Sequence, residues 1–459
     1  MNAPVSHDAL GDPWTMPLDQ IDVADARIFQ DDVWPDWFAR LRRDDPVHFT
    51  ADGQFGPYWS VTKYKDIMRV ETNPAVFSSA SGITLLDQET QYRLAMFIAM
   101  DPPKHDLQRL VVAPIVAPGN LANMAATIRQ RAIAILDNLP RNEPFDWVER
   151  VSIELTTQML AILFDYPFER RRDLTYWSNV AVANFKDPNA LVKTEEERFT
   201  ELRKMAAAMT ALWNERVNVP GGNDLISMLA HGEATRNMDP MEFMGNCVLL
   251  IVGGNDTTRN SISGGVWALN KHPDEYRKLR ENPGLIPSMV PEIVRWQTPI
   301  AYMRRTALED CEISGRTIRA GEKLAMWYIS GNRDAEAIED ADRFIIDRVR
   351  PRQHLSVGFG IHRCVGNRLA ELQLTILWEE IVKRFPLIEL VEEPKRVFSS
   401  FVHGISSMMV RIPGKGAARL VRPDRLKWRS STKCRRRFFC FGTIISQFSP
   451  GFGRMRLKK

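Results

Sequence analysis

Apolar residues recur every three or four positions along most of the chain, which is the pattern of amphipathic helices. The stretch after Thr194 follows this pattern for several turns. Its regularly spaced apolar residues are Phe199, Leu202, Met205, Met209 and Leu212. Thr194 and Glu197 form a capping box, in which the threonine side chain accepts from the third backbone N–H and the glutamate reaches back. We therefore expect a helix to begin there.

Strand-like patterns are shorter and fewer. Residues 47–61 predict a hairpin around Gly53, residues 315–328 predict a second hairpin, and residues 406–412 predict a late strand. Strands and helices do not alternate as they would in a parallel α/β sheet, and no internal repeat is present. The pattern favours a protein in which helices dominate.

Charge divides the chain into two parts. Residues 414–459 carry 14 Lys or Arg and one acid, whereas residues 1–413 carry 47 Lys or Arg and 56 acids. The larger part is acidic, so the overall positive charge is no argument for nucleic-acid binding. We take residues 1–413 as one functional domain. Residues 414–459 are expected to be a disordered or non-native basic tail, and the alternative is a basic, aromatic segment that touches anionic lipid.

Several features indicate a cytoplasmic protein. The start of the chain is polar and broken by prolines, unlike a signal peptide, and the longest apolar run, residues 247–254, is too short to span a bilayer. The five cysteines form no CxxC pair. A cysteine used singly fits a reducing compartment, where its thiolate serves as a nucleophile or as a metal ligand.

Residues 356–373, SVGFGIHRCVGNRLAELQ, place a cysteine between a glycine-rich bend and an amphipathic helix. The glycines let the backbone lie close to a flat ligand. The helix directs free N–H groups and its positive dipole end at Cys364, which favours the thiolate. Since His362 is two residues away, this stretch taken alone leaves open a Cys–His nucleophile or a zinc ligand pair.

A second unusual stretch, residues 245–265, lies inside a long helical pattern. Each of Gly253 and Gly254 costs a helix about 1 kcal/mol relative to alanine. The Thr257 hydroxyl can bond back to the carbonyl of Gly253 and open the helix locally. With Asp256 beside it, such a gap suits a small bound molecule and proton delivery, but a packing kink with a solvated Asp256 explains the same pattern.

Glu292 and Arg295, three residues apart, indicate no more than a weak surface pair when taken alone. In combination, GGNDTT (253–258), ExxR (292–295) and a glycine-rich bend ending in HxCxG (362–366) resemble the cytochrome P450 family, the haem-thiolate monooxygenases. MDPPKHDLQR (100–109), MRRTA (303–307) and FIIDR (344–348) extend the resemblance, which covers residues 20–413.

The resemblance implies a mainly α, α+β fold with a large helical domain, a smaller β-rich N-terminal part, and haem b between two long helices. Cys364 would be the axial thiolate ligand of the haem iron, pushing electron density toward the metal. The propionates of the haem would be bound by cationic donors of fixed geometry. The matching positions are His105, Arg109, Arg305 and His362.

The resemblance also assigns roles behind and above the haem. Asp256 and Thr257 match the family's catalytic acid–alcohol pair, in which Thr257 would hold oxygen and water at the reaction site and Asp256 would relay protons. Glu292 and Arg295 would be a buried structural ion pair, with Arg348 as a third member. Val357 departs from the family, which has phenylalanine there, and we expect a shifted reduction potential or a looser haem.

Residues 159–182, 303–307 and 354–374 are similar to the bacterial alkane and fatty-acid ω-hydroxylases. The implied reaction uses O2 to hydroxylate the terminal methyl of a small apolar substrate, a medium-chain alkane or fatty acid. An apolar list of this kind fits ordinary core residues equally well. The candidate substrate residues are Ile83, Leu85, Leu249, Leu250, Gly253, Ile300 and Ala301.

Electrons are expected to come from a ferredoxin and an NAD(P)H-dependent ferredoxin reductase, because the sequence contains no reductase domain. A basic patch beside the cysteine bend could dock an acidic ferredoxin, unless its arginines serve the haem or internal pairs. Its members are Arg350, Arg352, Arg363 and Arg368. Two alternatives to the ω-hydroxylase are a haem-thiolate hydroxylase of terpenes or steroids and a non-catalytic zinc- or haem-binding protein.

Overall fold

The structure is a computed structural model that describes residues 10–414. The predicted basic tail therefore lies, from residue 415 on, outside the described residues. Within residues 10–414, no single helix is long and apolar enough to cross a membrane. One pair bent by 48°, Lys104–Val116 with Pro118–Asp137, passes that test of length and composition only when the two are joined.

Helices make up most of the described chain, and the 32-residue α10 runs through its middle. Asp239 caps α10 by accepting hydrogen bonds from the backbone N–H groups of Met241 and Glu242, and Pro240 occupies its first turn. The helices are α1 (Ala26–Gln30), α2 (Trp34–Asp44), α3 (Tyr64–Glu71), α4 (Lys104–Val112), α5 (Pro118–Asp137), α6 (Glu154–Phe164), α7 (Arg172–Ala181), α8 (Glu195–Arg216), α9 (Leu225–His231), α10 (Pro240–Lys271), α11 (Pro273–Glu281), α12 (Ile286–Gln297), α13 (Tyr328–Gly331) and α14 (Asn367–Arg384).

The strands form one five-stranded sheet and three smaller sheets. The strands are β1 (Val47–Thr50), β2 (Tyr58–Val61), β3 (Phe77–Ser78), β4 (Pro144–Asp146), β5 (Met303–Ala307), β6 (Cys311–Ile313), β7 (Arg316–Ile318), β8 (Lys323–Met326), β9 (Glu389–Leu390), β10 (Lys395–Arg396), β11 (Ile405–Ser407) and β12 (Met409–Arg411). The large sheet has the order β1-β2-β8-β5-β3, in which the β2–β8 pair is parallel and the other pairs are antiparallel. The predicted α+β class is confirmed, although this sheet draws β5 and β8 from residues 303–326.

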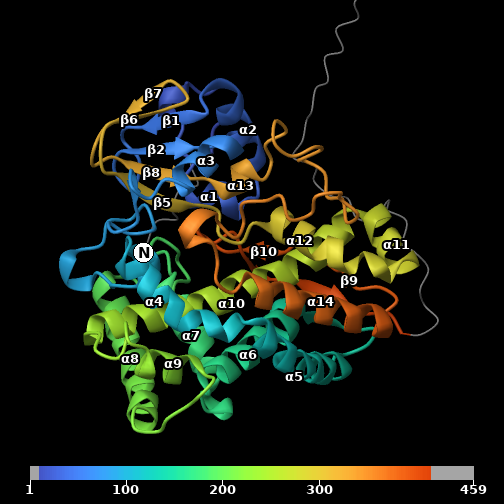
Figure 1. Cartoon of the computed structure of the whole chain (residues 1–459). Coiled ribbons are helices and arrows are strands. Elements are labelled where there is room, and N and C mark those ends of the chain that lie inside the picture. Colours follow the sequence, from blue (N-terminus) through green and yellow to red (C-terminus); the bar gives the residue numbers. More distant parts are fainter. Residues whose placement is uncertain (1–9, 415–459) are drawn as a thin grey trace, which may run out of the picture. The chain divides into compact units, whose positions relative to one another are not determined.

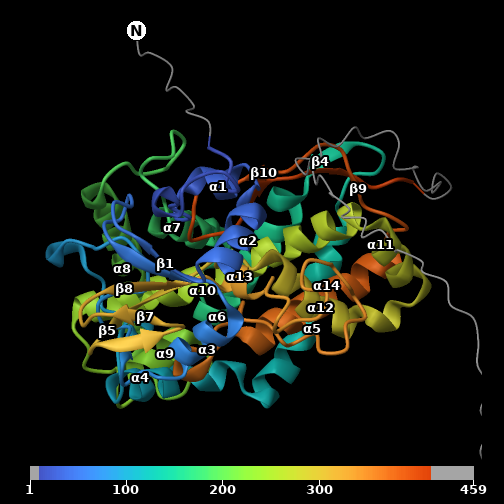
Figure 2. The same cartoon turned by 90° about the horizontal axis from the view of Figure 1, so that it is seen from above.

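In Figure 1 the large sheet lies with α1, α2 and α3 on one side of α10, and α5 to α9 lie on the other. Seen from above in Figure 2, α14 runs beside α12 and α5. Buried aromatic and aliphatic side chains of α1 and α2 pack against the sheet to form one core cluster. This arrangement places β5, the start of α14 and the middle of α10 around a common space.

The predicted capping box and first hairpin are confirmed. Thr194 accepts from the backbone N–H of Glu197 at 3.1 Å, and Glu197 reaches back to the N–H of Lys193 at 2.6 Å. β1 and β2 pair with Val47 opposite Val61. The second predicted hairpin is wrong, because β7 pairs with β6 and β8 pairs with β2 and β5.

The turn between β6 and β7 explains that error. It consists of two residues, Ser314 and Gly315, with φ of 47° and 78°, and a two-residue turn of this kind matches the twist of a hairpin. The predicted strand over 406–412 is also divided, because β11 pairs with β10 and β12 pairs with β4 and β9. A one-dimensional pattern does not reveal which neighbour a short strand will find.

Candidate active site

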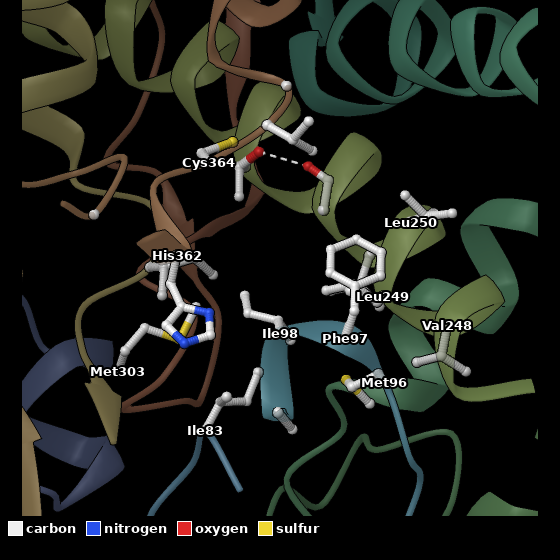
Figure 3. A pocket seen from close by; sticks show the side chains of 18 of the residues that line it. Ile83, Met96, Phe97, Ile98, Val248, Leu249, Leu250, Met303, His362 and Cys364 are labelled. Atoms are coloured by element: carbon white, nitrogen blue, oxygen red, sulfur yellow. Dashed lines mark hydrogen bonds between the residues drawn. The ribbon is translucent and has the colours of Figure 1, made fainter. Parts of the chain in front are cut away.

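A cavity of about 990 Å³ lies among α4, α10, β5 and the start of α14. Cys364 and His362 face it from the bend before α14, and Val248, Leu249 and Leu250 face it from α10 (Figure 3). The segment 81–100, which precedes α4, supplies further apolar side chains. Those labelled in Figure 3 are Ile83, Met96, Phe97 and Ile98.

The bend that carries Cys364 is held by its own backbone and by α3. The N–H of Cys364 donates to the carbonyl of Val357 at 2.7 Å, which closes the loop. Gly358 and Gly360 have φ of 65° and 63°, a region that favours glycine. A side chain at Gly360 would place its Cβ 2.3 Å from the carbonyl oxygen of Glu71, so the loop can approach the end of α3 only with glycine there.

Burial raises the pKa of the Cys364 thiol above its ordinary value. The backbone N–H groups of Gly366 and Asn367 and the charges of Arg109 and Arg363 lower this pKa, but by less. The N–H groups at the start of α14 therefore act in the predicted direction, toward the thiolate, although burial has the larger effect on the free thiol. A metal cation at the sulfur removes the proton outright.

His105 and His362 lie against each other with ring centroids 4.2 Å apart. Nε2 of His362 contacts the Ser79 hydroxyl at 3.0 Å, and Nδ1 of His105 contacts a carboxylate oxygen of Asp106 at 2.6 Å. The other ring nitrogens, Nδ1 of His362 and Nε2 of His105, are buried without a hydrogen-bond partner. Both residues line the cavity. Each ring therefore has one buried nitrogen that a hydrogen-bond partner inside the cavity would satisfy.

Burial lowers the pKa of both histidines, to about 2 for His362, where Arg305, His105 and Arg109 add to the effect. Burial and the neighbouring cations thus disfavour the protonated form of both rings, whereas a carboxylate placed beside them would favour it. Full positive charges at this position come from the two arginines, each imidazole offers a ring nitrogen, and binding of the propionates by these four residues stays a prediction.

Arg109 and Arg305 line the same side of the cavity. Arg109 donates to the backbone carbonyl of Arg363. Arg305, which is 3% exposed, donates to Oε2 of Glu71 at 2.8 Å, and Glu71 accepts from the hydroxyl of Tyr328 with its other oxygen. Glu71 thus fixes the orientation of Arg305 from behind while other N–H groups of the guanidinium remain.

These residues fit haem. Two carboxylates placed near Arg109 and Arg305 would satisfy the unpartnered nitrogens of His105 and His362 by charge-assisted hydrogen bonds. Cys364 is, among the cysteines in residues 10–414, the one that lines the cavity. The two readings that the local sequence left open find no support: the ring of His362 contacts Ser79 and His105, and residues 10–414 contain no metal-binding group of three His, Cys, Asp or Glu.

The acid–alcohol pair of α10 is divided between two environments. Thr257 lines the cavity, and its hydroxyl donates to the carbonyl of Gly253 at 2.9 Å, as the spacing predicted. Asp256 does not line the cavity. It is fully buried, accepts from the Ser178 hydroxyl of α7 at 2.7 Å and pairs with Arg259. Neighbouring residues of a helix point about 100° apart, which accounts for the division.

Most of the candidate substrate residues line the cavity, namely Ile83, Leu249, Leu250, Gly253 and Ile300. Leu85 and Ala301 do not line it, and we correct those two assignments. Both are fully buried in the core cluster between the sheet and the N-terminal helices, and the backbone N–H of Leu85 contacts the hydroxyl of Tyr302 at 3.1 Å. Residues 83–86 form a bend rather than a regular strand, so the spacing of Ile83 and Leu85 does not indicate which of them faces the cavity.

The expected ion pair behind the cysteine bend is confirmed. Glu292 and Arg295 of α12 are fully buried and form two hydrogen bonds, of 2.7 and 2.8 Å. Arg348 adds contacts to the same carboxylate. Arg295 also donates to the carbonyl of Asn332, whose side-chain amide donates to the hydroxyl of Ser356, next to Val357. The pair thus braces the bend through a hydrogen-bonded chain.

Sequence reasoning missed several residues of the cavity wall. Met96, Phe97 and Ile98 lie at a single 3-10 turn (Phe97–Ala99) that is too short to give a periodic pattern, and Phe401 lies in a loop after β10. Glu71, a buried acid at the end of an amphipathic helix, carries no signal that distinguishes it from a surface acid. Met303 shares the MRRTA segment with Arg305, so alternation along β5 could have indicated it.

A family model for cytochrome P450 matches residues 284–411. The linalool 8-monooxygenase of Pseudomonas putida is 35% identical over 407 residues, which cover 86% of this chain and 99% of that protein. The methyl-branched lipid omega-hydroxylase of Mycobacterium tuberculosis is 32% identical and covers 87% of this chain and 96% of its own length. Among solved structures, CYP153D17 from Sphingomonas sp. PAMC 26605 is 49% identical, with a TM-score of 0.82, and covers 87% of this chain and 100% of that chain.

Proposed function

Because this chain belongs to the cytochrome P450 family, it is a haem b monooxygenase, and we propose that it hydroxylates the terminal methyl of medium-chain alkanes or fatty acids. The observation that carries the proposal is the apolar wall of the cavity opposite Cys364. Leu249 and Leu250 of α10, Ile300 and Phe401 contribute to this wall. A hydrocarbon chain would lose its contact with water there, which is the usual source of affinity for such substrates.

Haem b with an axial cysteine thiolate supplies the oxidising chemistry when it is bound: one atom of O2 enters a C–H bond, and the other leaves as water after two electrons and two protons are delivered. We assign Cys364 as the axial ligand. Arg109, Arg305, His105 and His362 would hold the two propionates, for the reasons of charge and unsatisfied hydrogen bonds given above.

We assign the delivery of protons to Asp256 and Thr257, two neighbouring residues of α10. The Thr257 hydroxyl lines the cavity and can accept a hydrogen bond while it donates to the carbonyl of Gly253. Asp256 is held behind the helix by Ser178 and Arg259. A proton that reaches Asp256 from the α7 side therefore has to pass only to the next residue of the helix, Thr257. A movement of the Asp256 side chain away from Arg259 would bring its carboxyl group toward the Thr257 hydroxyl.

We assign the supply of electrons to a ferredoxin and its NAD(P)H-dependent reductase. Arg350, Arg363 and Arg368 are exposed and form no ion pair within the described part of the chain, while Arg352 pairs with Glu371 at 2.7 Å. Free cations close to the cysteine bend support docking of an acidic carrier next to the haem. Their alternative use in internal pairs finds no support.

A second candidate is hydroxylation of terpenes or steroids. It is favoured by the 35% identity to linalool 8-monooxygenase and by a 32% identical steroid C26-monooxygenase of Mycolicibacterium smegmatis. The ω-hydroxylation proposal is favoured by the methyl-branched lipid omega-hydroxylase and by the ω-hydroxylase-like segments of the sequence. Both candidates use the same haem machinery and differ in the shape of the bound substrate.

Optical titration of the purified ferric holoenzyme separates these candidates. n-Octane, dodecanoic acid and camphor would be added in parallel while the Soret band is followed. We expect octane or dodecanoic acid to move the band to its high-spin position. A band that moves with camphor alone would contradict the ω-hydroxylase proposal and favour the second candidate.

A further inference from the structure

We propose that the cavity contains a carboxylate-binding subsite formed by Arg198, which makes fatty acids the preferred substrates over alkanes. The inference rests on the proposed function, because it concerns the end of the hydrocarbon chain that lies away from the reacting methyl. It assigns a ligand chemistry to one residue of α8 that the haem machinery does not use.

Arg198 combines burial with an unsatisfied donor. It lies in the first turn of α8, is 9% exposed and lines the cavity. Its Nη1 pairs with Glu195 at 3.2 Å, and its Nη2 donates to the backbone carbonyl of Ala183 at 2.9 Å. Nε is buried without a hydrogen-bond partner. The guanidinium also lies over the ring of Phe185, with Cζ 4.1 Å from the ring centroid. A buried N–H that lacks an acceptor is costly, and a ligand oxygen that reached Nε would remove that cost.

The part of the cavity wall formed by α8 changes from a charged side chain, Arg198, to an apolar one, Leu202. Leu202, four residues after Arg198, lies on the same face of the helix, lines the cavity and is 2% exposed. A ligand with an oxygen group at Arg198 and a hydrocarbon chain starting at Leu202 would match this change. An alkane would match Leu202 but would leave Nε of Arg198 unsatisfied.

A second arginine that lines the cavity belongs to a segment in contact with α8. The rings of Tyr92 and Phe199 contact each other with centroids 5.5 Å apart, which joins the short helix Thr90–Tyr92 to α8. Arg93 and Arg198, each next to one of these rings in the sequence, both line the cavity. Arg93 is exposed, forms no ion pair within residues 10–414, and donates from Nη2 to the backbone carbonyl of Ala80. Two arginines from these contacting segments in the lining of one apolar cavity favour an anion over a neutral oxygen group.

Glu195 is the group that opposes this binding, since it already pairs with Arg198. Burial raises the pKa of Glu195, the charge of Arg198 lowers it in part, and the charge of Glu89 raises it further. Burial likewise lowers the pKa of Arg198, and the attraction of Glu195 offsets this in part. An incoming carboxylate would compete with Glu195 for the guanidinium, and Nε is the N–H group that the existing pair leaves without an acceptor.

The two ends of the cavity lie apart in the fold. Figures 1 and 2 both place α8 well away from α14, with α10 between them, whereas Cys364 lies just before α14. The same cavity is lined by Arg198 and by Cys364. A carboxylate anchored at Arg198 would hold its chain in one direction, with the methyl end toward Cys364 and Thr257. Terminal selectivity then follows from anchoring.

The test compares dodecanoate with its methyl ester, which keeps the chain and the oxygens but removes the charge. Dissociation constants are taken from the Soret shift of ferric holoenzyme at pH 8. We expect dodecanoate to bind at least tenfold more tightly than the ester, a difference of about 1.4 kcal/mol. Arg198→Met should remove this preference and leave the affinity for the ester within twofold. Arg203→Met, an exposed arginine of the same helix, is the matched control and should change neither value.

Equal loss of affinity for both ligands in Arg198→Met would overturn the subsite, since it would indicate a general packing defect. Should that variant not fold, the acid–ester comparison in the unmodified enzyme still decides: equal dissociation constants would overturn the subsite and leave ω-hydroxylation intact. Absence of any Soret shift with either ligand would instead contradict the proposed function itself.

Discussion

Glu292→Gln removes the anion that two buried arginines share. Oε2 of Glu292 accepts from Nε of Arg295 at 2.7 Å and from Nε of Arg348 at 3.0 Å. Oε1 accepts from Arg295 at 2.8 Å and from the backbone N–H of Ile345 at 2.9 Å. Glutamine has one acceptor oxygen, so at least one guanidinium would lose its partner, and both would lose their counter-charge.

The expected cost is about 3–5 kcal/mol, the usual penalty for breaking a buried ion pair by removing one partner. Since native proteins are stable by about 5–15 kcal/mol, the variant should be close to unfolding. With a urea m-value of about 3 kcal/mol/M, the unfolding midpoint should fall by about 1 M or more.

The effect should depend on pH in a defined direction. Burial alone would raise the pKa of Glu292, but the hydrogen bonds and charges of Arg295 and Arg348 outweigh it and lower that pKa. A depressed folded-state pKa gives stability that is present above the unfolded pKa of about 4.3 and is lost as pH falls through the folded value. The difference between Glu292→Gln and the unmodified protein should therefore shrink toward low pH.

The assay is urea unfolding followed by far-UV circular dichroism and by the Soret band. Glu309→Gln, at an exposed position, is the matched control and should stay within about 0.5 kcal/mol of the unmodified protein. A loss below 1 kcal/mol in Glu292→Gln, or a loss equal to that of the control, would refute the role assigned to the pair.

Thr257→Ala should keep NAD(P)H oxidation while product per NAD(P)H falls severalfold and hydrogen peroxide rises, and tight coupling would remove the assignment. Asp256→Asn should lower kcat by about 10²-fold, the scale of one acid–base group, with substrate Kd within twofold, and a change in Kd alone would contradict it. Val357→Phe should slow haem transfer to apomyoglobin and shift the reduction potential, because it adds apolar cover beside the bend. Glu71→Gln should make the potential more positive by tens of millivolts, where about 59 mV is tenfold for one electron, by removing the anion behind Arg305.

The sequence was most informative where chemistry and local geometry depend on neighbouring residues. The cap of α8 and the hydrogen bond from Thr257 to Gly253 involve residues three or four apart, and both were predicted correctly. The hairpin over residues 315–328 was predicted wrongly, because β7 turns back on β6 through Ser314 and Gly315 while β8 pairs with β2, more than 260 residues away in the sequence. Local spacing determines caps and turns, but tertiary packing selects strand partners.

The site shows the same division. Cys364, Arg305 and the two histidines were placed together through a family resemblance, and the cavity gathers all four. Their ionisation could not be predicted, because the pKa of His362 depends on burial and on arginines from other elements. Glu71 could not be predicted as a partner of Arg305 either, since 234 residues separate them in the chain.

The central claim is terminal hydroxylation of a linear chain by a haem enzyme. The most direct measurement is product analysis after turnover of n-octane with a ferredoxin, its reductase and NAD(P)H, by gas chromatography against the four isomeric octanols. The account predicts 1-octanol as the main product. A mixture dominated by 2-, 3- and 4-octanol would contradict it, because it would mean that the cavity holds the chain without presenting its end.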